Sequence, residues 1–101
     1  MDIVREIQAA IKTGKVLFGY RQTLKSIVNN QVKLTVISSN VPEQIRRDIT
    51  KLCKLSGIPI YEFPGTSWDL GAVCNKPFMV TTLAVLDPGA SGIIELAKGA
   101  Q

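Results

Sequence analysis

The sequence contains no histidine, and this absence excludes several kinds of site. Catalysis by Ser-His-Asp or Cys-His groups is impossible, because both need an imidazole to move the proton. A zinc site that used Cys53 and Cys74 would need carboxylates for its remaining ligands, which is an uncommon ligand set. These two cysteines are the only ones in the chain, and both fall on apolar faces of predicted helices. We therefore interpret them as reduced thiols buried in the core.

Long apolar segments and phosphate-binding motifs are also missing. No run approaches the roughly 18 apolar residues needed to cross a bilayer. The first six residues lack the charged and then apolar order of a signal peptide, so we expect a cytoplasmic protein without membrane association. There is no GxGxxG motif and no glycine-rich loop ending in GKS or GKT. The acids Asp48, Glu62, Asp69 and Asp87 are scattered over caps, turns and helix surfaces, so the sequence predicts no enzyme, cofactor or metal site.

The composition is that of a basic, folded domain. The chain has 101 residues, of which 46% are hydrophobic and 20% charged, and this balance favours one packed core over disorder. Lys and Arg outnumber Asp and Glu by 12 to 8, which gives a formal net charge of +4. Such a charge favours a polyanionic partner, RNA or DNA above all. We expect a single domain over residues 1–101, monomeric in isolation, since no coiled-coil pattern is visible.

Hydrophobic periodicity predicts helices and strands in alternation. In chain order we expect a helix over 3–13 with Asp2 as its N-cap, a strand over 15–18, a helix over 20–28, a strand over 33–38, a helix from Pro42 to 56, an edge strand over 58–63, a short helix after Thr66, a strand over 78–86, and a last helical turn or strand over 91–98. This order predicts the α/β class, a three-layer α-β-α sandwich with about four strands. Connections of this length favour mostly parallel neighbours.

Three details of this prediction bear on the outcome. The second helix should turn Tyr20, Leu24, Ile27 and Val28 to one buried face. The segment from Thr66 to Asp69 resembles a capping box, with Asp in place of Glu. The strand over 78–86 should place Phe78 and Val80 on one face and Met79 on the other.

The candidate binding residues lie in the loops that follow the strands. In an open α/β sheet, ligands gather beyond the carboxyl ends of the strands. Gly19 permits close backbone approach, and Arg21 and Lys25 lie one turn apart beside the positive end of a helix, which together favour a phosphate site. Asn40 could read a base edge or a sugar. In the segment from Lys76 to Val80, the aromatic Phe78 and the flexible apolar residues after it could pack against an unstacked base.

Each of these residues also has a structural interpretation. Arg21 and Lys25 could be ordinary solvated helix charges. Asn40 could turn the backbone or cap a helix, and Phe78 could be the first core residue of its strand. Trp68 and Tyr61 have no comparable loop setting, and we assign both to packing or to a rim.

Five segments of the chain together resemble one known family. They are Gly19 to Ser26, Lys33 to Asn40, Leu55 to Phe63, Gly65 to Gly71 and Leu86 to Gly89. In this order they are similar to the L30e ribosomal proteins, part of the wider L7Ae group of kink-turn-binding proteins. The resemblance implies an α-β-α sandwich around a four-stranded mixed sheet. It also implies a non-catalytic component of the large ribosomal subunit that binds kink-turn ribosomal RNA beside neighbouring ribosomal proteins. Some members of the family also bind a kink-turn in their own messenger RNA.

The resemblance assigns an RNA surface to positions of this chain. By correspondence with the family, the RNA-binding residues are Gly19, Arg21, Thr23, Lys25, Asn40, Arg46, Phe78 and Val80. One departure is Arg21-Gln22, where many members of the wider group have Asn-Glu; losing that carboxylate favours the ribosomal branch. Because no N-terminal extension stands before Met1, we expect an archaeal source. Two alternatives stay open, a nucleotide-binding domain that uses the same loops and an adaptor that binds an acidic protein with the basic side of the third helix.

Overall fold

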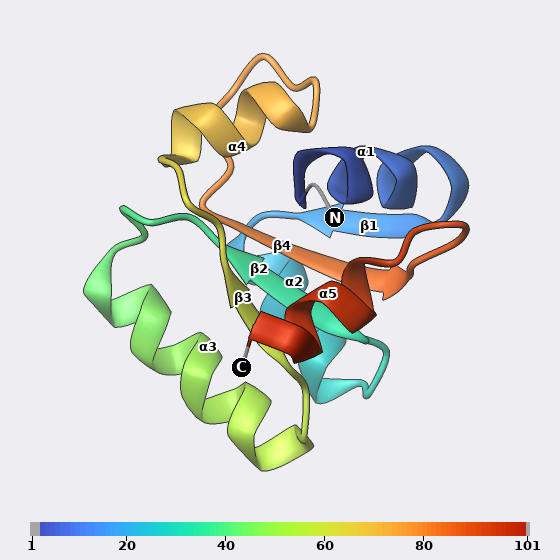
Figure 1. The fold of residues 1–101 in the computed structure, drawn as a ribbon. Helices are drawn as coiled ribbons and strands as arrows, with labels where there is room; N and C mark the ends of the chain where they lie inside the picture. Colours follow the sequence, from blue (N-terminus) through green and yellow to red (C-terminus); the bar gives the residue numbers. More distant parts are fainter. Residues whose placement is uncertain (1–2, 101) are drawn as a thin grey trace.

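The protein is described by a computed structural model that covers residues 3–100. Its elements are α1 (Ile3–Thr13), β1 (Lys15–Phe18), α2 (Tyr20–Val28), β2 (Leu34–Ile37), α3 (Glu43–Ser56), β3 (Ile60–Glu62), α4 (Ser67–Val73), β4 (Thr82–Asp87) and α5 (Ile93–Ala100) (Figure 1). The predicted order of elements is confirmed, and the last segment is a helix rather than a strand. The predicted N-cap, Asp2, lies outside the described residues. None of the described helices combines the length and apolar character that a bilayer crossing requires.

The four strands form one mixed sheet in the order β1-β4-β2-β3. β4 runs antiparallel to both of its neighbours, and only β2 and β3 pair in parallel. The mixed sheet implied by the family resemblance is confirmed, whereas the mostly parallel sheet expected from connection lengths is wrong. α4 has seven residues and is therefore only about 10 Å long, too short to carry the chain back across the sheet. The chain returns beside the start of α4, where Val80 N donates to Ser67 O at 3.0 Å, and re-enters the sheet in the opposite direction.

Helices cover both faces of this sheet, which confirms the three-layer sandwich (Figure 1). α1, α4 and α5 pack against one face through a core that includes Ile7, Leu70 and Ile93. α2 and α3 pack against the other face through Ile27 and Ile49. The strands supply both cores because successive side chains of a strand point to opposite faces. β2 turns Leu34 and Val36 to the first core and Ile37 to the second, and β4 turns Leu83 and Val85 to the first and Ala84 to the second.

The structure corrects three local predictions. Val28 is not on the buried face of α2: it is 67% exposed at the last turn. Pro42 is the N-cap of α3 rather than its first helical residue. β4 begins at Thr82, so residues 78–81 form a connecting segment without the alternation expected of a strand. The capping box at the start of α4 is confirmed, with Thr66 and Asp69 bonded reciprocally. Both cysteines are buried and free, as predicted.

One buried hydroxyl of the sheet gives a stability prediction. Thr82 is completely buried, and its Oγ1 has no hydrogen-bond partner among the residues that the structure describes. A buried polar group without a partner costs free energy because its hydrogen bonds to water are lost. We expect Thr82→Val, which keeps the shape and the β-branch, to raise the free energy of unfolding by about 1 kcal/mol. Denaturant unfolding of the variant and the parent protein measures the difference.

Thr23 is a matched control for this experiment. It is equally buried, but its Oγ1 donates to Gly19 O at 2.8 Å. Thr23→Val should therefore lower the free energy of unfolding. If Thr82→Val were also destabilising, the Thr82 hydroxyl would have to make a favourable hydrogen bond in solution.

Candidate nucleic-acid interface

The sheet topology brings four loops to one edge of the molecule. β1, β2 and β3 end at this edge, and β4, which runs the other way, begins there. Backbone hydrogen bonds join the loops directly. Gly19 N donates to Thr82 O at 2.9 Å, Ser38 N to Thr81 O at 2.9 Å, and Ser39 N to Gly65 O at 2.8 Å. Residues from distant parts of the sequence therefore form one continuous and rigid surface.

The start of α2 presents an open helix terminus at this edge. Gly19 is the N-cap, with φ 100° and ψ 154°, a conformation that is essentially restricted to glycine. Apart from Gly19 and its two chain neighbours, no described residue has a heavy atom within 4 Å of the place where a Cβ would stand on Gly19, so the backbone is open to a ligand. The helix has no side-chain cap and no acidic residue in its first turn. Its free N–H groups and the positive end of its dipole are therefore available to an anion.

The α2 side chains singled out from the sequence separate into two groups. Arg21 in the first turn and Lys25 in the last turn are both exposed, one turn apart on the same side of the helix. Thr23 is completely buried, and its hydroxyl is already bonded to Gly19 O. The structure therefore corrects the assignment of Thr23: its side chain holds the Gly19 backbone in place and does not face the surface. On the neighbouring side, Tyr20 donates to Asp48 Oδ2 at 2.8 Å, which ties α2 to α3 and raises the pKa of the Tyr20 hydroxyl.

Asn40 connects the loop after β2 to the start of α4. Its Oδ1 accepts hydrogen bonds from Ser67 N at 2.8 Å and from Ser38 Oγ at 3.1 Å, and its Nδ2 donates to Ser67 Oγ at 3.3 Å. The residue is nevertheless exposed. An amide nitrogen has two donors, and the second has no partner among the described residues. The side chain of Asn40 thus joins the loop after β2 to the start of α4, and its remaining N–H is held in a fixed direction from which it can bind a ligand.

Exposed apolar side chains flank this edge. Phe78 and Met79 are each 51% exposed, and Trp68 in α4 is 65% exposed. Val80, by contrast, is 2% exposed and belongs to the core beneath α1 and α4. The side chain of Val80 therefore packs inside the protein, which corrects its assignment to the RNA surface. Phe78 is exposed, so the interpretation of Phe78 as the first core residue of a strand is wrong.

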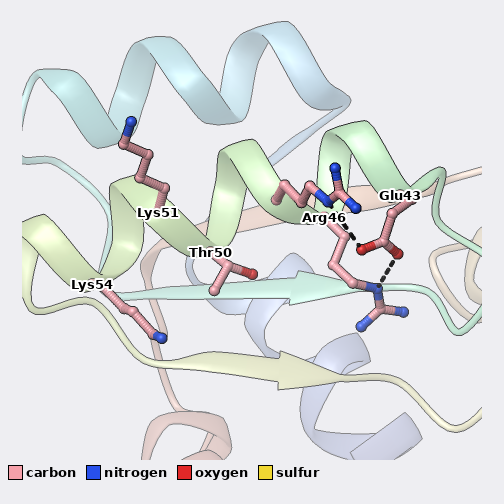
Figure 2. A pocket seen from close by; sticks show the side chains of 6 residues that line it. Glu43, Arg46, Thr50, Lys51 and Lys54 are labelled. Carbon is pink, nitrogen blue, oxygen red and sulfur yellow. Dashed lines mark ion pairs between the residues drawn. The ribbon is translucent and has the colours of Figure 1, made fainter.

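The outer side of α3 carries a second basic surface. Glu43, Arg46, Arg47, Thr50, Lys51 and Lys54 line a hollow of about 460 Å³. Figure 2 shows Lys51 and Lys54 extending to opposite sides of the helix. All of the lining side chains come from one helix, so the hollow is a shallow groove and not a preformed pocket for a small molecule.

The cationic side chains of α3 differ in whether they form ion pairs. Arg46 bonds to Glu62 Oε1 at 3.0 Å and lies 3.8 Å from Glu43, and Arg47 lies 3.5 Å from the same Glu43 carboxylate. The hydrogen bond to Arg46 lowers the pKa of Glu62 and raises that of Arg46. Arg46 is thus partly neutralised at the place where the family resemblance expects an RNA contact. Lys51 and Lys54 form no ion pair with any described residue.

The sequence singled out the segment from Lys76 to Val80 as a candidate, but it did not predict how Met79 and Lys76 are placed. Met79 was expected to follow a strand pattern, and its exposure shows only once β4 is seen to begin at Thr82. Lys76 places its Nζ 4.9 Å from the centroid of the Phe18 ring, a cation–π contact next to the Gly19 loop. Contacts of this kind depend on the fold and leave no local sequence signal.

Neither cysteine has the environment that activates a thiol, because both are buried. Burial raises the pKa of Cys74 to about 11, against a smaller lowering by Lys76, and burial also raises the pKa of Cys53. A thiol with such a pKa is protonated at neutral pH, and the thiolate is the reactive form. The cysteines therefore contribute packing, as the sequence predicted.

Comparison with known families agrees with this geometry. The model described as "Ribosomal protein L7Ae/L30e/S12e/Gadd45 family" matches residues 1–95. The chain belongs to this family. The resemblance inferred from the five sequence segments is thereby confirmed, and the surface described above is the loop face of an L7Ae/L30e-type domain.

Several archaeal relatives match along nearly their whole length. The chain is 47% identical over 100 residues to the large ribosomal subunit protein eL30 of Pyrobaculum calidifontis, which covers 99% of both chains. It is 47% identical over 96 residues to eL30 of Methanothermobacter thermautotrophicus, covering 95% of this chain and 98% of that protein. Among solved structures, a protein of unknown function from Bacillus halodurans has a TM-score of 0.83 at 23% identity, with 95% of each chain covered. The structural match supports the fold alone.

Proposed function

We propose that this chain is a non-catalytic component of the large ribosomal subunit that binds kink-turn ribosomal RNA through the loop edge of its sheet. The observation that carries the proposal is the meeting, at one edge, of an open helix start at Gly19, an oriented amide at Asn40 and a half-exposed aromatic ring at Phe78. Full-length similarity to large ribosomal subunit proteins named eL30 supports the ribosomal assignment.

The polar part of the surface fits the RNA backbone. Arg21 is a flexible cation in the first turn of α2, so it can neutralise a phosphate that approaches the free N–H groups. Lys25 lies one turn further along the same side of the helix, where its long side chain can neutralise a neighbouring phosphate. Phosphate contacts position a protein on its nucleic acid but carry little sequence information. Asn40 and the Gly19 backbone, which are held rigidly, supply hydrogen bonds to a base edge or a sugar.

The apolar part of the surface explains a preference for bent RNA. A base inside a regular duplex is stacked and offers no face to Phe78, whereas a kink exposes bases that can stack on an aromatic ring. The protein would capture the kinked conformation from the ensemble, since a ligand shifts an equilibrium only by its differential affinity for the two states.

The test is a titration at several salt concentrations. The purified protein is titrated with a kink-turn RNA and with the same duplex lacking the internal loop. We expect tight binding to the kinked RNA, with a gain of several kcal/mol over the control duplex. Equal, weak and strongly salt-dependent binding to both RNAs would mean that the net charge alone is at work, and would contradict the proposal.

Lys25→Ala should weaken kink-turn binding and flatten its salt dependence. Each phosphate contact that is lost reduces the slope of log affinity against log salt concentration by about 0.7–0.9. Lys33→Ala is the control, because Lys33 is equally exposed but precedes β2 at the opposite edge of the sheet. An unchanged slope for Lys25→Ala would remove Lys25 from the phosphate contacts.

A second candidate function rests on α3. Lys51 and Lys54 are exposed and unpaired among the described residues, so the outer side of the helix could bind an acidic protein segment. In that case Lys51→Gln with Lys54→Gln would abolish the protein interaction and leave kink-turn affinity little changed. A competition experiment separates the two candidates: if α3 binds the protein partner and the loop edge binds RNA, the partner should not displace the RNA.

A further inference from the structure

Trp68 is an unusually exposed aromatic residue. It is the single tryptophan of the chain, and 65% of it is exposed. The buried side of α4 consists of Ser67, Leu70 and Gly71, and Trp68 points away from it. Packing therefore does not account for the indole. A single exposed apolar residue is common, but a group of them marks an interaction site, and Trp68, Phe78 and Met79 are all exposed beside the loop edge.

The start of α4 is held firmly against the loop edge. The capping box of Thr66 and Asp69 fixes the first turn of the helix. Ser67, directly before Trp68, donates its N–H to Asn40 Oδ1 at 2.8 Å and accepts a hydrogen bond from Val80 N at 3.0 Å. Trp68 is therefore one residue away from direct bonds to two loops of the candidate interface.

The segment that carries Phe78 runs alongside the same helix. A Cβ added to Gly71 would lie 2.2 Å from Phe78 O, so the backbone of residue 78 touches α4 one turn beyond Trp68. Because Val80 bonds to Ser67, residues 78–80 pass along α4 from Gly71 back to its start. Long side chains of a helix lean toward its N-terminus, and the N-terminal end of α4 is the end that is bonded to the Asn40 loop. Figure 1 shows the start of α4 close to the loop between β2 and α3.

We propose that Trp68 is a further base-stacking residue of this interface, which extends the apolar surface of Phe78 and Met79 and stacks on an unpaired nucleobase of the bound RNA. The inference rests on the function proposed above. An indole face stacks on any base, and the contact needs no partner charge. Trp68 should therefore contribute affinity that does not depend on salt, unlike Arg21 and Lys25.

The single tryptophan makes the contact directly observable. On saturation of the unaltered protein with kink-turn RNA, we expect quenched indole fluorescence and reduced accessibility to acrylamide. Trp68→Ala should lower the affinity at least roughly fivefold without changing the salt slope, and Trp68→Phe should recover part of the loss. The control is Leu55→Ala, because Leu55 is 76% exposed at the far end of α3. A thermal unfolding curve for each variant shows that folding is intact.

The outcomes separate this inference from the function on which it rests. Tight kink-turn binding in a filter assay, with unchanged fluorescence and a wild-type affinity for Trp68→Ala, would overturn the stacking role and leave the proposed function standing. If the unaltered protein does not prefer the kinked RNA, the proposed function fails, and the role of Trp68 falls with it. If only a protein partner quenches the indole, the surface belongs to that partner instead.

Discussion

Phe78→Ala is expected to reduce the affinity for kink-turn RNA roughly 5- to 150-fold, which corresponds to about 1–3 kcal/mol for one lost base stack. The ring is 51% exposed at the loop edge, so much of its surface is free to meet a base. No charge is removed, and the dependence of log affinity on log salt concentration should therefore stay as it is in the parent protein. Titrations at three or more salt concentrations measure both quantities at once.

The same variant also tests where Phe78 belongs. A half-exposed side chain contributes little to the core, so Phe78→Ala should unfold at nearly the same temperature as the parent protein. Loss of Phe78 with unchanged RNA affinity would remove the ring from the interface. Leu55→Ala, which removes an exposed apolar side chain from another place, should alter neither affinity nor salt slope.

Gly71→Ala is expected to lower the free energy of unfolding by about 1–3 kcal/mol. In an isolated helix the change would be favourable by about 1 kcal/mol, because alanine is the better helix former. Here the new methyl group would lie 2.2 Å from Phe78 O, which is backbone and cannot rotate away. Either α4 or residues 78–80 must move, and both present parts of the proposed RNA surface.

Two measurements on Gly71→Ala separate stability from binding. Denaturant unfolding gives the loss of stability, and titration with kink-turn RNA at a temperature where the variant is folded gives the loss of affinity. Ala72→Gly is the control, because it weakens helix propensity at an exposed neighbouring position. If Gly71→Ala were as stable as the parent protein and bound RNA equally well, the close packing of α4 on residues 78–80 would not fix the position of Phe78.

The basic residues do not all have the same role. Arg21, Lys25, Lys51 and Lys54 contribute to the same net charge, yet Arg21 stands at the open start of α2, Lys25 one turn further along that helix, and the two others on the side of α3. Arg46 is occupied by Glu62 and Glu43. The net charge therefore favours a polyanionic partner. The position of each cationic side chain in the fold decides whether it can contact that partner.

Local patterns predicted most of the secondary structure. The capping box at Thr66, the left-handed C-cap at Gly57 and the periodic isoleucines of α1 involve residues a few positions apart, and short-range geometry decides them. The prediction was wrong where a residue fits the apolar period but does not meet the core. Val28 fits the period of α2, yet it is exposed in the last turn of that helix. The candidates Gly19, Arg21, Lys25, Asn40 and Phe78 all lie exposed or half-exposed at the predicted edge.

The sequence by itself determined the α/β class, the basic character, the family and the loops that carry the candidate site. The class and the loops follow from the hydrophobic periodicity, the basic character from the composition, and the family from the five segments that resemble it. Only the tertiary structure decided that β4 inserts antiparallel between β1 and β2, since strand partners are chosen by contacts between distant residues. That insertion brings residues 78–80 to the other loops, buries Val80 and Thr23, and leaves Phe78 and Trp68 exposed. The exposure of a side chain depends on how the whole molecule packs, so the sequence pattern predicts it incompletely.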